Sequence, residues 1–192
     1  REEVPADDTH ALARKTVEYG MESLCLQVAG PSLAFVFFGA TGVFVYVAVM
    51  AQFLVFGRMT PAYLHFGATV RAAERLINIL PAVLTALLLA LAAGVVSRGK
   101  PVMALVLPVK QARGDDSFNR GLVMAAAAGG LGISLGGPRR WPGGEASCGE
   151  WMGAGGDTAR TDAADLKRAA MLGFVAFLIL SLAFSGALMM RV

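Results

Sequence analysis

The sequence predicts an all-α integral membrane protein. Of its 192 residues, 56% are hydrophobic and 16% are charged, whereas about 25% of residues in an average soluble domain are charged. The mean hydropathy is +0.60, and several uncharged runs reach the roughly 20 apolar residues that cross a bilayer. These observations argue against a soluble globular domain and predict the lipid bilayer as the immediate partner of the chain.

Charge and cysteine usage exclude other classes. Lys and Arg number 17 against 14 Asp and Glu, a net charge of +3, and no basic block occurs, so we expect no nucleic acid partner. Cys25 and Cys148 lack a CxxC spacing or a nearby histidine pair, which excludes a disulfide framework and leaves metal ligands unassigned. Because residue 1 is arginine, we expect residues 1–192 to form a single membrane domain that lacks an upstream part.

Residues 9–28 are predicted to form the first helix, with apolar residues recurring along one face. Gly30-Pro31 is expected to end this helix. Glu18 and Glu22 lie four residues apart, so both carboxylates face the same side. Three residues can cap its first turn: Asp7, Asp8 and Thr9.

Three runs have the length of membrane spans. Residues 31–56 carry no charge and are long enough to cross with some tilt. Residues 76–96 form the second predicted span, in which Pro81 removes a backbone hydrogen bond and should kink the helix beside Asn78. Residues 169–190 form the third span, broken only by serines and small residues.

The connections between these spans differ in character. Residues 98–120 are a polar connection with room for a short surface helix. Residues 121–137 are apolar but short, and their small residues at four-residue spacing predict close packing against other helices. Residues 138–168 form a glycine-rich polar loop. Asp162, with Asp165 three residues later, resembles an N-cap arrangement for the final helix.

The positive-inside rule discriminates between two topologies. If residues 121–137 are re-entrant or buried in protein, the side with 1–30, 98–120 and 138–168 carries 13 Lys and Arg residues and the other side carries 4. If they cross the membrane, the split is 9 against 8. The stronger bias favours three transmembrane helices plus a short Gly/Ala-rich re-entrant or buried helix, with the charged loops in the cytoplasm.

One stretch of the chain resembles a known family. Residues 117–138 read S-F-N-R-G-L-V-M-A-A-A-A-G-G-L-G-I-S-L-G-G-P. This stretch resembles the C-terminal signature of the membrane-bound adenosylcobinamide-phosphate synthase family of cobalamin biosynthesis, which reads approximately S-P-N-A-G-W-P-x-A-A-x-A-G-A-L-G-V-x-L-G-G-P. Weaker similarity extends through blocks around Glu22, Tyr46, Tyr63 and Asn78 and covers most of the chain.

The resemblance implies a function. Members of that family are membrane synthases that couple adenosylcobyric acid to aminopropanol or its phosphate through an ATP-dependent amide bond. The resemblance therefore implies ATP and Mg²⁺ as cofactors, a corrinoid and an amine as substrates, and a bacterial inner membrane as the location.

The chemistry of amide formation selects candidate site residues. The reaction needs an activating phosphoryl group, a divalent cation to hold the phosphates, and an acceptor for the amine proton. Two carboxylates on one helical face can share a cation, so Glu18 and Glu22 are the candidate catalytic residues. The candidates for substrate or phosphate binding combine two amides, a glycine turn and two guanidinium groups: Asn78, Asn119, Gly136, Gly137, Arg139 and Arg140.

Each candidate also has a purely structural interpretation. The paired carboxylates could belong to a solvated helix face, and the polar pair Glu74 and Asn78, four residues apart, could make a packing hydrogen bond. Arg139 and Arg140 could anchor the chain at the membrane boundary. Asn119, with the preceding Asp115 and Asp116, could form a solvated turn.

Several positions depart from the family pattern. Ser23 stands where an asparagine is usual, Glu74-Arg75 stands where the family has Asp-Asp, and Val83 replaces an arginine. The alternative function is therefore a non-catalytic, diverged relative that acts as a membrane subunit or signalling protein, with a protein partner or as a homo-oligomer.

Overall fold

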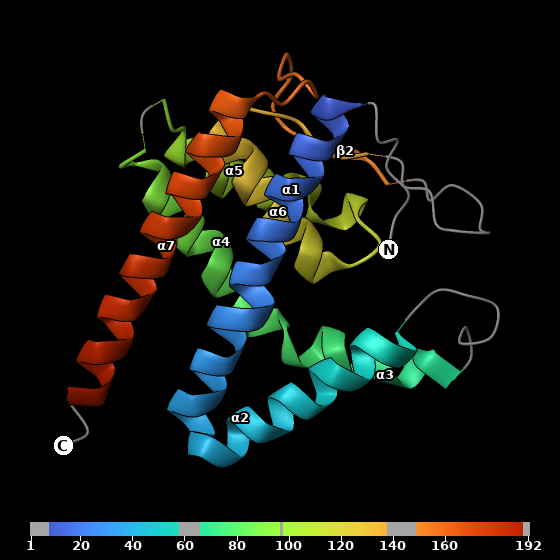
Figure 1. Cartoon of the computed structure of the whole chain (residues 1–192), viewed down its shortest axis with the longest axis vertical. Coiled ribbons are helices and arrows are strands. Elements are labelled where there is room, and N and C mark those ends of the chain that lie inside the picture. The colour runs from blue at the N-terminus through green and yellow to red at the C-terminus, as the bar shows by residue number, and fades with distance from the viewer. Residues whose placement is uncertain (1–7, 58–65, 97, 138–148, 190–192) are drawn as a thin grey trace.

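The computed structural model describes residues 8–57, 66–96, 98–137 and 149–189, and these are mostly helical. Figure 1 shows a bundle in the upper half of the view, from which α2 and the end of α7 extend downward. The elements in chain order are α1 (Thr9–Ser23), η1 (Leu24–Ala29), α2 (Gly30–Phe56), α3 (Phe66–Ile77), α4 (Ile79–Ala93), α5 (Pro101–Gln111), η2 (Ala112–Gly114), α6 (Phe118–Leu131), β1 (Leu135–Gly136), β2 (Trp151–Met152) and α7 (Ala163–Met189).

The first helix continues beyond the point where the sequence predicted its end. Asp8 caps α1 as expected, because its side chain accepts a hydrogen bond from the Ala11 amide. The predicted stop at Gly30-Pro31 is wrong, since the helix widens into the π-helical turn η1 and continues into α2. In this turn the Gly30 amide donates to the Cys25 carbonyl, five residues back. Pro31 then lies at the start of α2, where its missing N–H group is tolerated.

The first predicted span, 31–56, is not a straight helix. Gly39 has φ 64° and ψ −154°, values that are accessible to glycine but strained for other residues. Figure 1 shows α2 descending from η1, turning at the bottom of the view, and running toward α3. The whole stretch Thr9–Phe56 has the length and composition of a membrane-crossing helix.

The second predicted span is a bent pair of helices. α3 and α4 meet at Asn78 with a bend of 48°, which confirms the kink predicted from Pro81. The bounds differ from the predicted 76–96, because α4 covers only Ile79–Ala93 and has the hydropathy and length of a span only together with α3.

The final helix agrees closely with the sequence prediction. The amide of Asp165 donates to Asp162 Oδ1 at 2.8 Å, and the amide of Asp162 donates to Asp165 Oδ2 at 3.3 Å. These reciprocal bonds confirm the predicted cap, and the Asp165 N–H group lowers the pKa of the Asp162 carboxyl. Within the described residues, two helices are long and apolar enough to cross a membrane, or three if the α3–α4 pair is one broken span.

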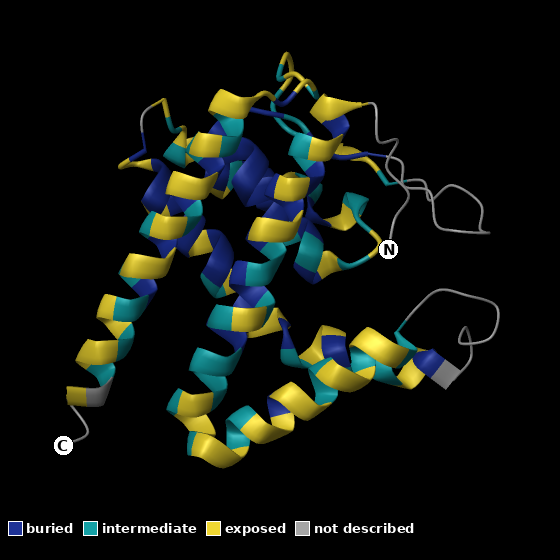
Figure 2. Ribbon diagram, in the orientation of Figure 1, coloured by how far each residue is buried: buried dark blue, intermediate teal, exposed yellow. Residues whose placement is uncertain are grey.

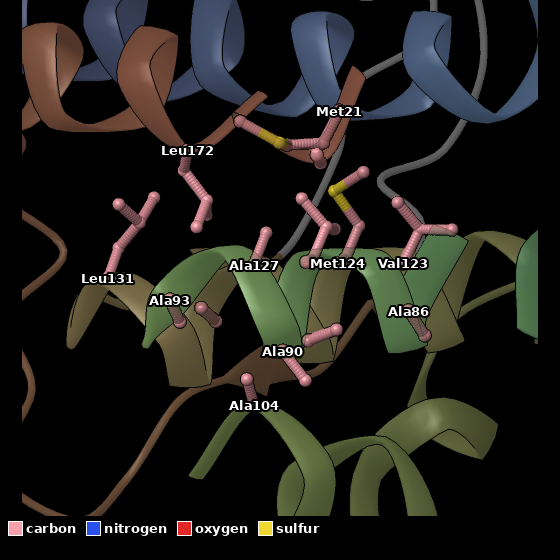
Figure 3. Packing of buried hydrophobic residues seen from close by; sticks show 14 of the residues in the cluster. Met21, Ala86, Ala90, Ala93, Ala104, Val123, Met124, Ala127, Leu131 and Leu172 are labelled. Atoms are coloured by element: carbon pink, nitrogen blue, oxygen red, sulfur yellow. The ribbon is translucent and has the colours of Figure 1, made fainter. Parts of the chain in front are cut away.

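The Gly/Ala-rich helix α6 is the centre of the bundle. It is buried along nearly its whole length (Figure 2) and packs against α1, α4, α5 and α7. Figure 3 shows Ala127 and Met124 of α6 among Ala90 of α4, Met21 of α1 and Leu172 of α7. A Cβ atom on Gly129 would lie 2.5 Å from the Met103 carbonyl oxygen, so glycine allows α5 to approach α6 closely.

This helix is shorter than the predicted segment 121–137. It ends at Leu131, followed by Gly132 in the left-handed conformation at φ 68°, which commonly terminates helices. The chain then forms β1, which pairs antiparallel with β2. The predicted polar connection 98–120 contains α5, which buries Ala104 and Leu107 against its neighbours.

The predicted loop 138–168 is structured where it is described. Residues 138–148 lie outside the described part, and the remainder contains β2 and a turn that docks on α5. Gln111 Nε2 donates to the Gly153 carbonyl at 2.9 Å, and the Gly153 amide donates to Gln111 Oε1 at 3.0 Å. This two-way hydrogen bond holds the turn against the bundle.

Candidate functional site

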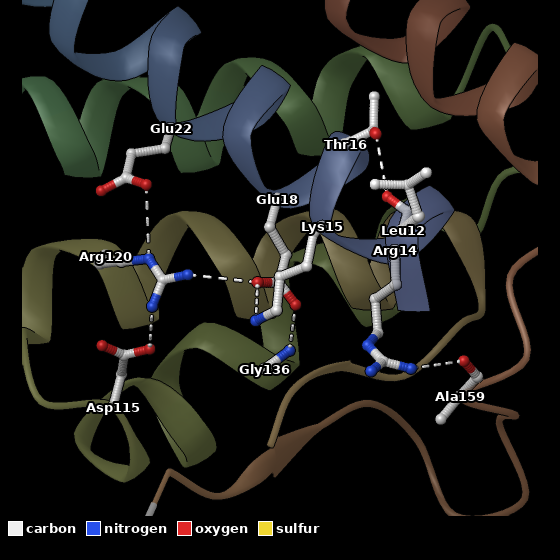
Figure 4. A network of polar contacts seen from close by, with 10 residues as sticks. All are labelled: Leu12, Arg14, Lys15, Thr16, Glu18, Glu22, Asp115, Arg120, Gly136 and Ala159. Carbon is white, nitrogen blue, oxygen red and sulfur yellow. Dashed lines mark hydrogen bonds and ion pairs between the residues drawn. The ribbon is translucent and has the colours of Figure 1, made fainter. Parts of the chain in front are cut away.

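Glu18 lies at the junction of three elements. Its side chain is 1% exposed and accepts hydrogen bonds from Lys15 Nζ at 2.8 Å, Arg120 Nη2 at 3.2 Å and the Gly136 amide at 2.8 Å. Figure 4 shows these contacts between α1, α6 and β1. Because both carboxylate oxygens have donors, Glu18 holds the three elements together.

Arg120 joins Glu18 to two further carboxylates. Its Nη1 atom lies 3.2 Å from Asp115 Oδ2, and its Nε atom lies 3.5 Å from Glu22 Oε2 (Figure 4). The planar guanidinium group has five N–H donors in a fixed fork, which suits several acceptors at once. Burial raises the pKa of the Asp115 carboxyl, although Arg120 and the Ser117 amide both favour its charged form.

A cavity of about 600 Å³ opens beside this network. Residues of α1, η1, α2, α3, α6 and the 115–117 turn line it. This volume lies in the range of roughly 300–1,000 Å³ that is common for small-molecule sites. Its lining includes acidic and basic side chains: Glu22, Arg71, Glu74, Arg75, Asp115, Asp116 and Arg120.

Asn119 connects two walls of this cavity. Its Nδ2 atom donates to the Arg75 carbonyl at 2.6 Å, and Arg75 Nη2 donates to the Asp116 carbonyl at 2.9 Å. These two bonds join the start of α6 to α3, and Asn119 itself lines the cavity.

Asn78 lies behind the cavity wall, at the break between α3 and α4. It is fully buried, and its Nδ2 atom donates at 3.1 Å to both the carbonyl and Oε1 of Glu74. Its Oδ1 atom accepts from the Tyr46 hydroxyl at 2.8 Å, and that hydroxyl also lies 2.9 Å from the Leu26 carbonyl. Asn78 therefore contacts Glu74, which lines the cavity, and not the cavity itself.

The glycine turn lies on the β1 side of the network. The Gly136 amide donates to Glu18, and the Gly137 amide donates to the Glu150 carbonyl at 3.1 Å. Both amides already have acceptors, so binding phosphate would require these bonds to exchange. Arg139 and Arg140, the other residues predicted for phosphate binding, lie outside the described residues.

The described side chains of this site could hold a metal ion only together with ligands from a bound molecule. Within the described residues, no group of three or more His, Cys, Asp or Glu side chains is placed to hold an ion. Mg²⁺ is commonly held by one or two carboxylates together with substrate phosphates and waters.

Comparison with known proteins identifies the family of this chain. Residues 3–173 match the family model described as CobD/Cbib protein. The chain belongs to this family. It is 38% identical over 127 residues to the cobalamin biosynthesis protein CobD of Geobacter metallireducens, covering 65% of this chain and 39% of that protein.

Other CobD/Cbib relatives extend the similarity. Identity to the CobD protein of Chromobacterium violaceum is 35% over 136 residues, or 71% of this chain and 42% of that protein. Identity to the CobD protein of Rhizobium meliloti is 29% over 184 residues, or 94% of this chain and 55% of that protein. The chain thus spans about two fifths of the length of the first of these relatives. No solved structure matches the chain.

Within this CobD/Cbib chain, the structure separates the predicted site residues into groups. Glu22 and Asn119 line the cavity, whereas Glu18 and Asn78 lie behind it and hold residues that line it. Gly136 reaches the same network only through Glu18.

Sequence reasoning assigned no role to Arg120, and it considered Glu74 only as the partner of Asn78 in a polar pair. Arg120 bonds three carboxylates, and Glu74 lines the cavity. A signal for Arg120 was present in the sequence, since it is a charged residue that directly precedes an apolar Gly/Ala-rich run. Glu74 lies four residues before Asn78, and only the bend of the backbone shows that its side chain faces the cavity.

Proposed function

We propose that this chain forms the ATP-dependent amide-coupling site of a cobalamin-biosynthesis membrane synthase, which joins adenosylcobyric acid to aminopropanol or its phosphate. Membership of the CobD/Cbib family supports the pathway. The cavity is the observation that best supports the proposed reaction, because it combines carboxylates with the guanidinium groups of Arg71, Arg75 and Arg120.

The charges of the cavity suit the reactants. A nucleotide and the carboxylate to be activated are both anionic, and arginine binds phosphate and carboxylate groups in a bidentate manner. Mg²⁺, when bound with the nucleotide, would neutralise charge on the phosphates during transfer. We assign the binding of these anionic groups to Arg71 and Arg75, which both line the cavity.

Glu22 is the proposed acceptor of the amine proton. The ammonium group first gives up one proton, because only the uncharged amine attacks. The nitrogen then bonds to the activated carbonyl carbon, the bond from that carbon to the phosphate oxygen breaks, and the second proton leaves with the phosphate. Glu22 lines the cavity, and Arg120 at 3.5 Å fixes the orientation of its carboxylate. Glu18 bonds the same guanidinium from behind and acts as a positioning residue.

We further propose that the cavity opens to the cytoplasm, the side that holds ATP. The surplus of Lys and Arg in the loops that flank α1, α5 and α7 supports this orientation. The predicted topology put residues 57–75 on the opposite side, but Arg75 bonds Asn119 and lines the same cavity. We therefore infer that α2, broken at Gly39, turns back instead of crossing the membrane. A corrinoid exceeds a volume of about 600 Å³, so only its reacting side chain would enter the cavity.

A direct assay tests this function. Detergent-purified full-length protein is incubated with adenosylcobyric acid, aminopropanol phosphate, ATP and Mg²⁺, and the amide product is measured by mass spectrometry. We expect product from the parent protein, loss of product from Glu22→Gln, and unchanged product from Glu150→Gln, which removes an exposed carboxylate outside the cavity. Absence of product from the parent, beside an active relative in the same assay, would refute the proposal and favour a non-catalytic membrane subunit.

A further inference from the structure

Glu74 is a deeply buried carboxylate at a cavity wall. It lies on α3, its residue is 7% exposed, and it lines the cavity of about 600 Å³. A buried carboxylate is strongly destabilising unless a cation or several hydrogen-bond donors compensate its charge. The groups that compensate the charge of Glu74 therefore indicate which ligand the cavity binds.

The contacts of Glu74 include no direct ion pair, and Arg75, the next residue of α3, favours its charge only through space. Oε1 accepts a hydrogen bond of 3.1 Å from Asn78, which is a neutral amide. Among the described residues, no ion pair joins Glu74 to a lysine, arginine or histidine. Oε2 of Glu74 has no hydrogen-bond partner among the described residues. It is also not one of the fully buried polar atoms that lack a partner, so it is accessible to solvent. This oxygen therefore faces the cavity.

Two other carboxylates of the cavity differ from Glu74 in this respect. Glu22 and Asp115 both contact Arg120, at 3.5 Å and 3.2 Å. Their charges are compensated within the protein, whereas that of Glu74 is available to a ligand.

We propose that Glu74 binds the primary ammonium group of the amine substrate in this cavity. This inference rests on the proposed function and assigns one part of its site. An ammonium group carries one positive charge and three N–H donors, so a carboxylate with one open oxygen compensates it. A metal ion held by protein ligands alone does not fit, because Glu74 belongs to no group of three ligating side chains within the described residues.

Two buried side chains fix the position of this carboxylate. Asn78 bonds both Oε1 and the backbone carbonyl of Glu74, and the Tyr46 hydroxyl bonds Asn78 in turn. Tyr46 also reaches the Leu26 carbonyl in the π-helical turn. Asn78 and Tyr46 are therefore positioning residues, and they place the Glu74 carboxylate at the bend between α3 and α4.

Binding of a small amine to the full chain in detergent tests the assignment. The probe is 1-amino-2-propanol, with 1,2-propanediol as a neutral analogue of similar size, and each is titrated by calorimetry in the presence and absence of ATP and Mg²⁺. We expect Glu74→Gln to weaken binding of the amine about tenfold or more and to leave binding of the diol unchanged. Glu74→Asp keeps the charge and should restore part of the affinity.

Two further variants separate this inference from the proposed function. Glu22→Gln should lose product formation but keep its affinity for the amine, and Glu150→Gln should change neither. If the parent protein makes no amide product but binds the amine in a Glu74-dependent way, the ammonium site stands and the synthase proposal fails. If product forms but Glu74→Gln binds the amine as tightly as the parent, or if the parent binds no amine under either condition, the ammonium site is wrong.

Discussion

The bundle around α6 and the extended parts of α2 and α7 use apolar residues in opposite ways. In α6 the buried side chains are mostly small, including Ala125, Ala126 and Ala127, which have no exposed surface. In α2 the large aromatic residues face outward, and Phe38 and Phe44 are 74% and 76% exposed. Figure 2 shows this difference between the dark upper bundle and the lighter lower helices.

The difference shows which solvent each region meets. Large apolar surfaces of this extent are rarely exposed to water, and lipid tails cover such residues without cost. Between helices in a membrane, small residues allow close packing, because burial of apolar surface from lipid supplies little driving force. Thus the large aromatic residues of α2 face outward, whereas α6 contributes mostly small residues to the interior.

Loss of the Arg120 charge should have the largest effect on the stability of the bundle. Arg120→Met removes the partner of Glu18 and Asp115, whose carboxylates are each 1% exposed. Removing one member of a buried ion pair costs about 3–5 kcal/mol, so we expect the free energy of unfolding in detergent to fall by about that amount. Thermal unfolding measures this loss of stability. The control is Lys110→Met, which removes an exposed cation. Equal stability of the two variants would contradict the central role of Arg120.

A charge on the extended part of α2 should affect insertion and not folding of the bundle. Phe44→Asp places a carboxylate on an outward-facing position, where insertion of a charged residue costs about 3 kcal/mol at the centre of a span. We expect a lower inserted fraction in a membrane-insertion assay, and a change in detergent stability within about 0.5 kcal/mol. Phe44→Leu is the control, and equal insertion of the two variants would show that this face does not meet lipid.

A single added methyl group should change the melting temperature in α6 but not in the extended part of α7, and the effect should be smaller than those above. In Gly129→Ala the new Cβ atom would meet the Met103 backbone at 2.5 Å, whereas in Gly186→Ala of α7 it would meet nothing within 4 Å. Overpacking typically costs about 1–3 kcal/mol, so we expect Gly129→Ala to lower the melting temperature in detergent. Gly186→Ala should leave it unchanged or slightly raised, because alanine favours helix. A similar shift in both variants would mean that α5 and α6 are not in close contact.

Local signals in the sequence were sufficient for several features. The cap at Asp162 and the bend at Asn78 each depend on residues within about one helical turn of one another, and the membrane character of α7 depends on one continuous apolar run. The stop predicted at Gly30-Pro31 was wrong, because the π-helical turn η1 joins α1 to α2 and Pro31 lies in the first turn of α2, where its missing N–H group is tolerated.

The sequence by itself determined that the chain is helical, that its apolar runs reach membrane length, and that residues 117–138 carry the family signature. Only the tertiary structure placed Gly136 on Glu18, 118 residues away, and Glu74 in the wall of the cavity. Helical periodicity specifies which side chains share a face, since each turn repeats after 3.6 residues. It does not specify which faces meet, because that depends on turns such as the one at Gly39 and on packing between helices far apart in the chain.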